Sequence, residues 1–433
     1  MKAIRFGLLS FAGILLLGAS FLSGARYGSL VFTWLGVPVG LPNQVTGTST
    51  EPDDVAPTFD LFWEAWNVVT HNYVDKQALD IKRMTYGAIQ GMVNSLGDGG
   101  HSRFLNPASY RSEQDSLRGN FVGIGAEVGL RNGQPVVILP LDGSPAQQAG
   151  MQAGDSILRV NGEDVSHFTL NDLMTRLRGD AGTKVTITVL HQGADAPADL
   201  MVTRARVRSQ PVSYYLMPDT NVADIRLSQF SNGAGSELRS VLKVVADNHV
   251  DGIVLDLRDN PGGILDQAVD VASQFMDQGT VVVTRDASGM EKKLEAKPGG
   301  LATNVPLTVL TNNATASAAE IVAGALEENH RATVIGQPTF GTGTVLSTFH
   351  LKDGSAILLG TSQWLTPDGE LIKGKGIQPN ITVRLNSQSD ILTPSRAQQL
   401  PATQVANSSD SQLAAAIRYL AEHPEVRTGA PAA

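Results

Sequence analysis

The chain has 433 residues, of which 42% are hydrophobic and 17% charged, so it is long enough and apolar enough to bury the cores of two or three domains. Its net charge of −9 at pH 7 argues against nucleic acid as the main partner. The chain has no cysteine, which excludes disulfides, Cys-ligated metal sites and a thiol nucleophile.

The N-terminus has the pattern of an export signal. Lys2 and Arg5 precede an uncharged apolar run at residues 6–22. A positive flank before such a run predicts export with the N-terminus inside. We assign residues 1–28 to a signal anchor, a membrane helix, or to a cleaved signal peptide; the absence of a clean Ala-x-Ala site favours the anchor. The bulk of the chain is therefore expected in the cell envelope, outside the cytoplasm, either membrane-anchored or secreted.

A linker and a helical segment follow. Residues 29–57 are assigned to the linker, whose second part is rich in Pro, Thr, Asp and Gly. Residues 58–117 form the helical N-terminal segment, in which aromatic residues recur at helical spacing and predict a helix with a buried face: Phe59, Phe62, Trp63 and Trp66.

Residues 118–208 read as a compact unit of short strands and helices. Gly-Ser-Pro-Ala at 143–146 begins a short helix, and Gly-Asp-Ser-Ile-Leu-Arg-Val-Asn-Gly at 154–162 is a strand with an Asn-Gly turn. This pattern resembles a PDZ domain, a module that adds an extended peptide to an open sheet edge. The resemblance implies that backbone N–H groups of Gly123, Ile124 and Gly125 hold a peptide's terminal carboxylate.

Strands and helices alternate over residues 209–386, which predicts an α/β core with a mixed sheet. In such folds sites lie at the carboxyl ends of strands. Two loops occupy such positions: the Pro-Gly-Gly turn at 261–263, and the junction that contains Ser317. Residues 387–433 are assigned to a polar C-terminal tail with one helix at 412–421 and no chemistry.

Ser317 lies between an apolar strand, 305–310, and a helix, 318–328. A hydroxyl there faces the positive end of the helix dipole and unpaired backbone N–H groups, which suit a nucleophile and its oxyanion. The alternative is an ordinary helix cap, because Ser317 and Glu320 have the spacing of a capping box.

Three features coincide with a known family. A PDZ-like unit precedes the α/β core, which contains Leu-Asp-Leu-Arg-Asp-Asn-Pro-Gly-Gly at 255–263. Ala-Ser-Ala-Ala-Glu at 316–320 is followed by Gly-Gln-Pro-Thr-Phe-Gly at 336–341. The chain resembles the C-terminal processing peptidases, or tail-specific proteases, over roughly residues 58–386. The resemblance implies a serine nucleophile at Ser317 and an oxyanion hole from the backbone N–H groups of Gly262 or Gly263 and of Ala318.

The chain departs from the family at the general base. The family uses a lysine within Phe-Gly-Lys-Gly-x-Val-Gln, where this chain has Thr342. A threonine cannot act as a base near neutral pH, so we assign this role to His101. Gly-His-Ser at 100–102 resembles the Gly-His-Ser/Thr motif of the tricorn-like branch, and imidazole needs no tuning of its pKa.

Several assignments stay open at this stage. Lys373 and Lys375 are alternative amine bases, and Glu320, Asp259 and Asp98 are candidates for the acid that orients His101. The sequence therefore predicts a serine endopeptidase with a Ser-His mechanism. Its partners are protein or peptide substrates held by their C-terminal segments, and the membrane through the N-terminal helix; no nucleic acid, metal or cofactor is implied. The alternative function is an inactive, peptide-binding protease scaffold.

Overall fold

A computed structural model describes residues 56–425 except 100, 132, 142, 169, 209, 218–219 and 386–390. The predicted signal segment, 1–28, and almost all of the linker, 29–57, lie outside the described residues. The chain divides into two compact units, residues 1–72 with 348–351, and residues 73–347 with 352–433, and each is described by itself.

The described part of the first unit is dominated by helix α2 (Ala56–Asn72). The helix agrees with the aromatic spacing, and its rings contact one another, with the centroids of Phe62 and Trp63 5.1 Å apart. Among the described residues this aromatic face is not buried as predicted, because Phe59 is 44% and Trp63 53% exposed, whereas Phe62 and Trp66 are half-buried. No described helix combines the length and the apolarity needed to cross a membrane.

In the second unit, capped helices precede the PDZ-like part. Asp80 accepts a hydrogen bond from the Arg83 N–H and caps α3, and Asn106 caps α4, whose first residue is proline. These elements are η1 (Lys76–Ala78), α3 (Ile81–Asn94), β1 (Arg103–Leu105) and α4 (Pro107–Leu117).

The PDZ-like part is a separate sheet with its own core. Strand β2 (Asn120–Gly123) pairs with β9 (Ala205–Arg208), so its first and last strands lie side by side. The sheet order is β3-β4-β5-β7-β8, with β6 on β5, over a core that includes Ile157, Leu173 and Ile187. The remaining elements are β3 (Ala126–Arg131), β4 (Gln134–Pro140), α5 (Pro145–Gln148), β5 (Ser156–Val160), β6 (Glu163–Asp164), α6 (Leu170–Leu177), β7 (Lys184–Leu190) and β8 (Ala198–Thr203).

The predicted mixed sheet is confirmed in the α/β core. Its order is β10-β11-β12-β15-β16-β19, in which β10 is antiparallel to β11 and the other neighbours are parallel. The three central strands are buried at every position, because both faces are covered. The strands are β10 (Val212–Met217), β11 (Val222–Leu227), β12 (Gly252–Asp256), β15 (Leu307–Thr311), β16 (Thr333–Gly336) and β19 (Ile381–Thr382).

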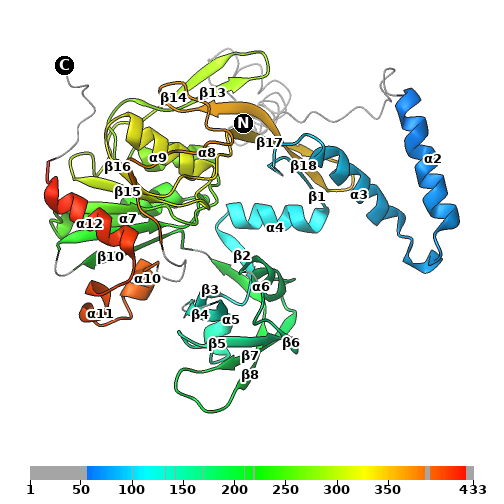
Figure 1. Ribbon diagram of the computed structural model, residues 1–433, viewed down its shortest axis with the longest axis horizontal. Helices are drawn as coiled ribbons and strands as arrows, with labels where there is room; N and C mark the ends of the chain where they lie inside the picture. Colours follow the sequence, from blue (N-terminus) through cyan, green and yellow to red (C-terminus); the bar gives the residue numbers. More distant parts are fainter. Residues whose placement is uncertain are drawn as a thin grey trace, which may run out of the picture. The chain divides into compact units, whose positions relative to one another are not determined.

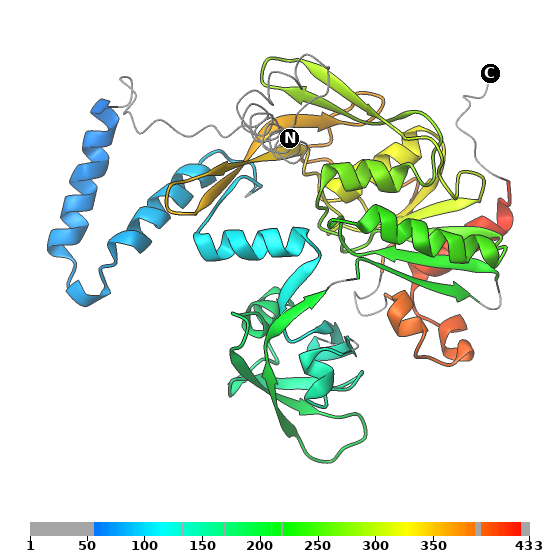
Figure 2. The same cartoon turned by 180° about the vertical axis from the view of Figure 1, so that it is seen from behind.

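Two sets of helices cover this sheet. Helix α7 lies in front of it in Figure 2, and α12 lies in front in Figure 1, so they cover opposite faces. Helices α7, α8 and α9 pack into the main core on one face of the sheet. Helices α10, α11 and α12 pack into a smaller core on the other face. The helices are α7 (Ala234–Asp247), α8 (Leu265–Ala272), α9 (Ala318–Glu328), α10 (Pro394–Ala397), α11 (Ala402–Ala406) and α12 (Ser411–Glu422).

The C-terminal segment differs from the polar tail predicted for residues 387–433. Its described residues, 391–425, form three helices, and Leu413, Ala416 and Leu420 of α12 pack against the buried sheet residues Val254 and Leu310. These apolar residues recur at helical spacing among alanines and polar residues, so the overall composition concealed a buried face.

A second sheet brings the segment after α3 to the catalytic region. Its order is β1-β18-β13-β14, with β17 also on β18. Strand β1 pairs with β18 through Arg103 and Leu358, which fixes residues 101–105 beside the core although they precede the PDZ-like part. The strands are β13 (Thr280–Asp286), β14 (Glu291–Glu295), β17 (Thr344–His350) and β18 (Ala356–Leu365).

Candidate active site

Ser317 occupies a strained turn between β15 and α9. Its φ of 55° and ψ of −120° lie where a residue with a side chain is rarely found. Two tertiary hydrogen bonds hold the turn: Thr315 Oγ1 donates to the Leu257 carbonyl over 2.9 Å, and the Ala316 N–H donates to the Asn260 carbonyl over 2.9 Å. Backbone strain that is held in place by its surroundings is typical of functional sites and exceeds what a simple helix cap requires.

The Pro-Gly-Gly turn lies directly against Ser317. A methyl group added at Gly262 would come within 2.7 Å of the Ser317 Cβ and 2.8 Å of the Ala318 nitrogen. The same addition at Gly263 would come within 2.4 Å of the Phe230 carbonyl oxygen. Both glycines have positive φ, 93° and 143°, so the close approach and the backbone conformation each require glycine.

The N–H groups at this turn differ in their partners. The Gly262 N–H donates to Asn260 Oδ1 over 2.8 Å and is therefore engaged. The N–H groups of Gly263 and Ala318 have no hydrogen-bond partner among the described residues. Of the three candidates for the oxyanion hole, Gly263 and Ala318 thus remain as donors, and Gly262 supplies the close backbone contact.

Glu320 joins Ser317 to the loop that carries residue 342. Its fully buried carboxylate accepts the Ser317 N–H at 2.8 Å and the Thr342 N–H at 3.0 Å, both on Oε2. The other oxygen accepts the Gly341 N–H at 2.6 Å and the Thr339 hydroxyl at 2.5 Å. Because one oxygen binds both backbones, residue 342 is held beside the nucleophile.

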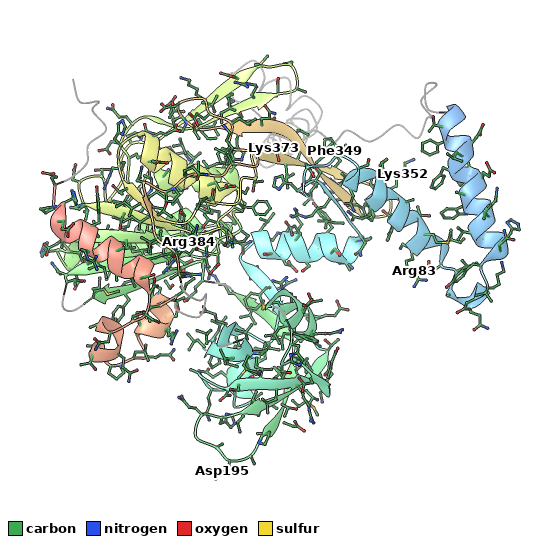
Figure 3. The ribbon with its side chains drawn as sticks, viewed as in Figure 1. Arg83, Asp195, Phe349, Lys352, Lys373 and Arg384 are labelled. Carbon is green, nitrogen blue, oxygen red and sulfur yellow. The ribbon has the colours of Figure 1, made fainter. Side chains whose placement is uncertain are left out.

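Thr342 itself is 7% exposed and so lies inside the site. Of the alternative lysine bases, Lys373, labelled in Figure 3, starts beside this loop, because a methyl group added at Gly343 would come within 2.6 Å of its Cβ. Both Lys373 and Lys375 are exposed. In the described residues neither lysine forms a salt bridge with a carboxylate.

His101 binds the same loop through Thr344. Its Nε2 is 3.0 Å from the Thr344 carbonyl oxygen, which only accepts, so Nε2 carries the hydrogen in this arrangement. Burial lowers the pKa of the imidazole below its usual 6.5, and the Thr344 bond opposes that shift. Within the described residues no hydrogen bond joins His101 to Ser317 directly; both are tied to residues 342–344.

None of the three candidate acids binds the His101 ring through a hydrogen bond in the described structure. Glu320 is committed to Ser317 and the loop. Asp259 accepts from the Asn312 side chain over 2.8 Å, and Asp98 accepts the Ser102 N–H over 2.8 Å. The orienting group present is the Thr344 carbonyl, which motif analysis does not find because any residue supplies a carbonyl.

The predicted carboxylate loop of the PDZ-like part is buried, and Ile124 is 3% exposed. The carbonyls of Ile124 and Gly125 accept from Ala146 and Leu141, at 2.7 and 2.9 Å. The N–H groups of Ile124 and Gly125 have no partner among the described residues. Gly125 is required, because an added methyl group would come within 2.5 Å of the Ser144 Cβ.

Metal chemistry has no visible site in the described part of the chain. No group of three or more His, Asp or Glu side chains there is arranged to hold a metal ion.

The fold and the site together define a class: a mixed α/β serine peptidase core with a PDZ domain before it. The family model of Peptidase family S41 matches residues 221–383, and that of the PDZ domain matches residues 136–190.

Two curated relatives extend the match over most of the chain. A carboxyl-terminal-processing protease of Synechocystis sp. is 35% identical over 361 residues, which cover 78% of this chain and 84% of the relative. The carboxy-terminal processing protease CtpA of Bacillus subtilis is 34% identical over 76% of this chain and 69% of its own length. The chain therefore belongs to peptidase family S41, the serine-type carboxyl-terminal processing proteases.

A solved structure supports the fold. A putative S41 protease from Bacteroides fragilis aligns with a TM-score of 0.54 at 19% identity, covering 82% of this chain and 96% of that one.

Proposed function

We propose that the chain is an active serine endopeptidase that cleaves protein substrates near their C-termini with a Ser-His mechanism. The observation that carries this proposal is the strained backbone at Ser317, which lies against the Pro-Gly-Gly turn, with the N–H groups of Gly263 and Ala318 lacking hydrogen-bond partners among the described residues. Donors that are already oriented in the resting protein stabilise the oxyanion without reorganisation.

His101 is the base in this proposal. Its Nε2 hydrogen is held by Thr344, so the nitrogen free to take a proton from Ser317 is Nδ1. The serine oxygen then forms a bond to the substrate carbonyl carbon, and the proton passes to the leaving amine as the peptide bond breaks. The Thr344 carbonyl fills the orienting role of the carboxylate in Ser-His-Asp sites. The lowered pKa keeps the ring in its neutral, accepting form.

Substrate capture and location complete the proposal. The N–H groups of Ile124 and Gly125, which have no hydrogen-bond partner among the described residues, support binding of a terminal carboxylate beside an added peptide strand. Lys2, Arg5 and the apolar run at 6–22 support export to the cell envelope, with the N-terminal segment as a membrane anchor or signal peptide.

A fluorophosphonate probe tests the nucleophile on the full chain. We expect labelling of the wild type, none in Ser317→Ala, and unchanged labelling in Ser288→Ala, a matched change in the exposed β13–β14 turn. Casein hydrolysis should follow the same order. A folded wild type that is never labelled, or labelling that persists in Ser317→Ala, would instead support the peptide-binding scaffold.

A further inference from the structure

A buried arginine links the Pro-Gly-Gly turn to the C-terminal helices. Arg258, four residues before Gly262, is fully buried. Its Nε and Nη2 donate to the two oxygens of Asp256 over 2.9 and 2.8 Å. Its remaining nitrogen, Nη1, donates to Asp410 Oδ1 over 2.9 Å and to Gln412 Oε1 over 3.3 Å. A guanidinium that is shielded from solvent stays charged and fixed in position only if carboxylates and other acceptors bind its N–H groups.

Asp410 fixes the C-terminal helix at the same point. Its Oδ1 also accepts the Leu413 N–H at 3.0 Å and so caps α12. Its Oδ2 accepts the Leu392 N–H at 2.9 Å. One carboxylate, 1% exposed, therefore joins the turn of the catalytic core to two points of residues 391–425.

A displacement of Arg258 would be transmitted to Ser317 through short bonds. Asp259, the next residue, has a positive φ of 59°, and its N–H donates to Asn312 Oδ1 over 3.0 Å. Asn260 binds the Gly262 N–H through its side chain and the Ala316 N–H through its carbonyl. The turn and the nucleophile loop thus move as one body, and its far end is held by Asp410.

We propose that Asp410, acting through Arg258, is a positioning residue for the oxyanion hole, so that the C-terminal helices complete the active site. The inference rests on the proposed function of Ser317 as nucleophile. Misplacement of a reacting group by about 1 Å costs about 100-fold in rate. The helices α10 to α12 are thus expected to set turnover as well as to cover the sheet.

The test uses Asp410→Asn in the full chain, with Asp80→Asn as the matched control, an exposed N-cap that binds the Arg83 N–H. We expect Asp410→Asn to lower kcat by about 10- to 100-fold with KM within about threefold, at a temperature where it is folded by circular dichroism. Asp80→Asn should keep the wild-type kcat. A folded Asp410→Asn with kcat within about twofold of the wild type would overturn the inference.

Two further measurements separate this inference from the proposed function. Amide hydrogen exchange of residues 257–264 should rise in Asp410→Asn relative to Asp80→Asn even in a protein without turnover, and unchanged exchange would overturn the inference. If Asp410→Asn does not fold, Gln412→Met removes the weaker acceptor of Arg258, together with the bond from Gln412 Nε2 to the Val383 carbonyl, and should show the same kcat loss in smaller degree. A folded Gln412→Met with unchanged kcat and exchange would also count against it. Absence of Ser317 labelling in the wild type would reject the proposed function alone.

Discussion

The two sides of the proposed active site differ in the groups that supply their chemistry, which are backbone N–H groups on one side and side chains on the other. The oxyanion side consists of backbone N–H groups at Gly263 and Ala318, held by a close-packed turn. The base side depends on individual side chains, and there the chain has Thr342 where the family has lysine. A single substitution removes a side chain's chemistry, whereas a backbone donor is lost only if the turn is rebuilt. On the proposed mechanism, this contrast accounts for a chain that keeps its backbone oxyanion donors and takes its base from another residue.

The largest effect is expected from Gly262→Ala. The new methyl group would press on Ser317 and Ala318 and displace both oxyanion donors, so kcat should fall by about 10²- to 10³-fold, the cost of losing a donor. Gly289→Ala is the control, because it shares a positive φ of 85° but meets nothing within 4 Å. Steady-state kinetics on one peptide measure both. Equal losses in the two variants would show that backbone strain, rather than the contact with Ser317, causes the effect.

His101→Ala tests the base side. Removal of a general base costs about 10²-fold or more, so kcat/KM should fall by that amount while the protein remains folded. His167→Ala, an exposed histidine of the PDZ domain, should keep wild-type kinetics. If His101→Ala hydrolyses peptide at the wild-type rate, the base lies elsewhere, and Lys373 becomes the first residue to substitute.

A lysine at position 342 should rescue the His101→Ala variant. Glu320 holds the residue-342 backbone beside Ser317, and burial at 7% exposure would lower the pKa of a lysine there toward a useful base. We expect His101→Ala/Thr342→Lys to recover at least about tenfold in kcat/KM over His101→Ala, a part of what a positioned base contributes. Thr366→Lys, at another buried threonine, gives the comparison. A folded double variant without recovery would mean that the loop does not present residue 342 to the nucleophile.

The features that could be predicted from the sequence are those encoded in short, continuous segments. The mixed sheet and the glycine turn follow from apolar runs, from Pro-Gly-Gly and from a serine before a helix. The sequence could not predict the contacts that unite the site, because these join distant residues. His101 and Thr344 are 243 positions apart, and Arg258 and Asp410 are 152 apart. The capping-box spacing correctly paired Glu320 with Ser317, but it says nothing of residues 339–342, which the same carboxylate also binds. The buried C-terminal face was missed because alanine-rich, polar composition masked it.

The pH profile should show the environment of His101. The protonated ring cannot accept a proton, so kcat/KM should fall as pH decreases through the His101 pKa. Burial lowers that pKa, which places the midpoint of the acid limb below 6.5. The same shift makes His101 contribute stability above its unfolded pKa that is lost as pH falls through the folded value. An acid limb at or above 6.5, or one unchanged in His101→Ala, would contradict the assignment.

The smallest effect is expected on stability, at the buried Asp224 on β11. Neither carboxylate oxygen has a hydrogen-bond partner among the described residues, and burial, then the nearby Asp256, raises its pKa well above the usual 3.8. A raised folded pKa gives stability that is complete below the unfolded pKa and is lost as pH rises. Asp224→Asn cannot ionise, so its unfolding temperature should gain on the wild type as pH rises above the unfolded pKa of 3.8.

Asp353→Asn supplies a control of opposite sign. Hydrogen bonds from Ser355 and Tyr86 lower the Asp353 pKa to about 2, so its contribution is present above the unfolded pKa and lost as pH falls. Relative to the wild type, that variant should therefore lose stability as pH rises from about 2 to 3.8, and the difference should then stay constant. Thermal unfolding of the three proteins across both pH ranges measures both trends. If the unfolding temperature of Asp224→Asn instead falls relative to the wild type as pH rises, Asp224 is ionised in the folded protein. The buried acids beside Arg258 then carry one more negative charge than they do with a neutral Asp224.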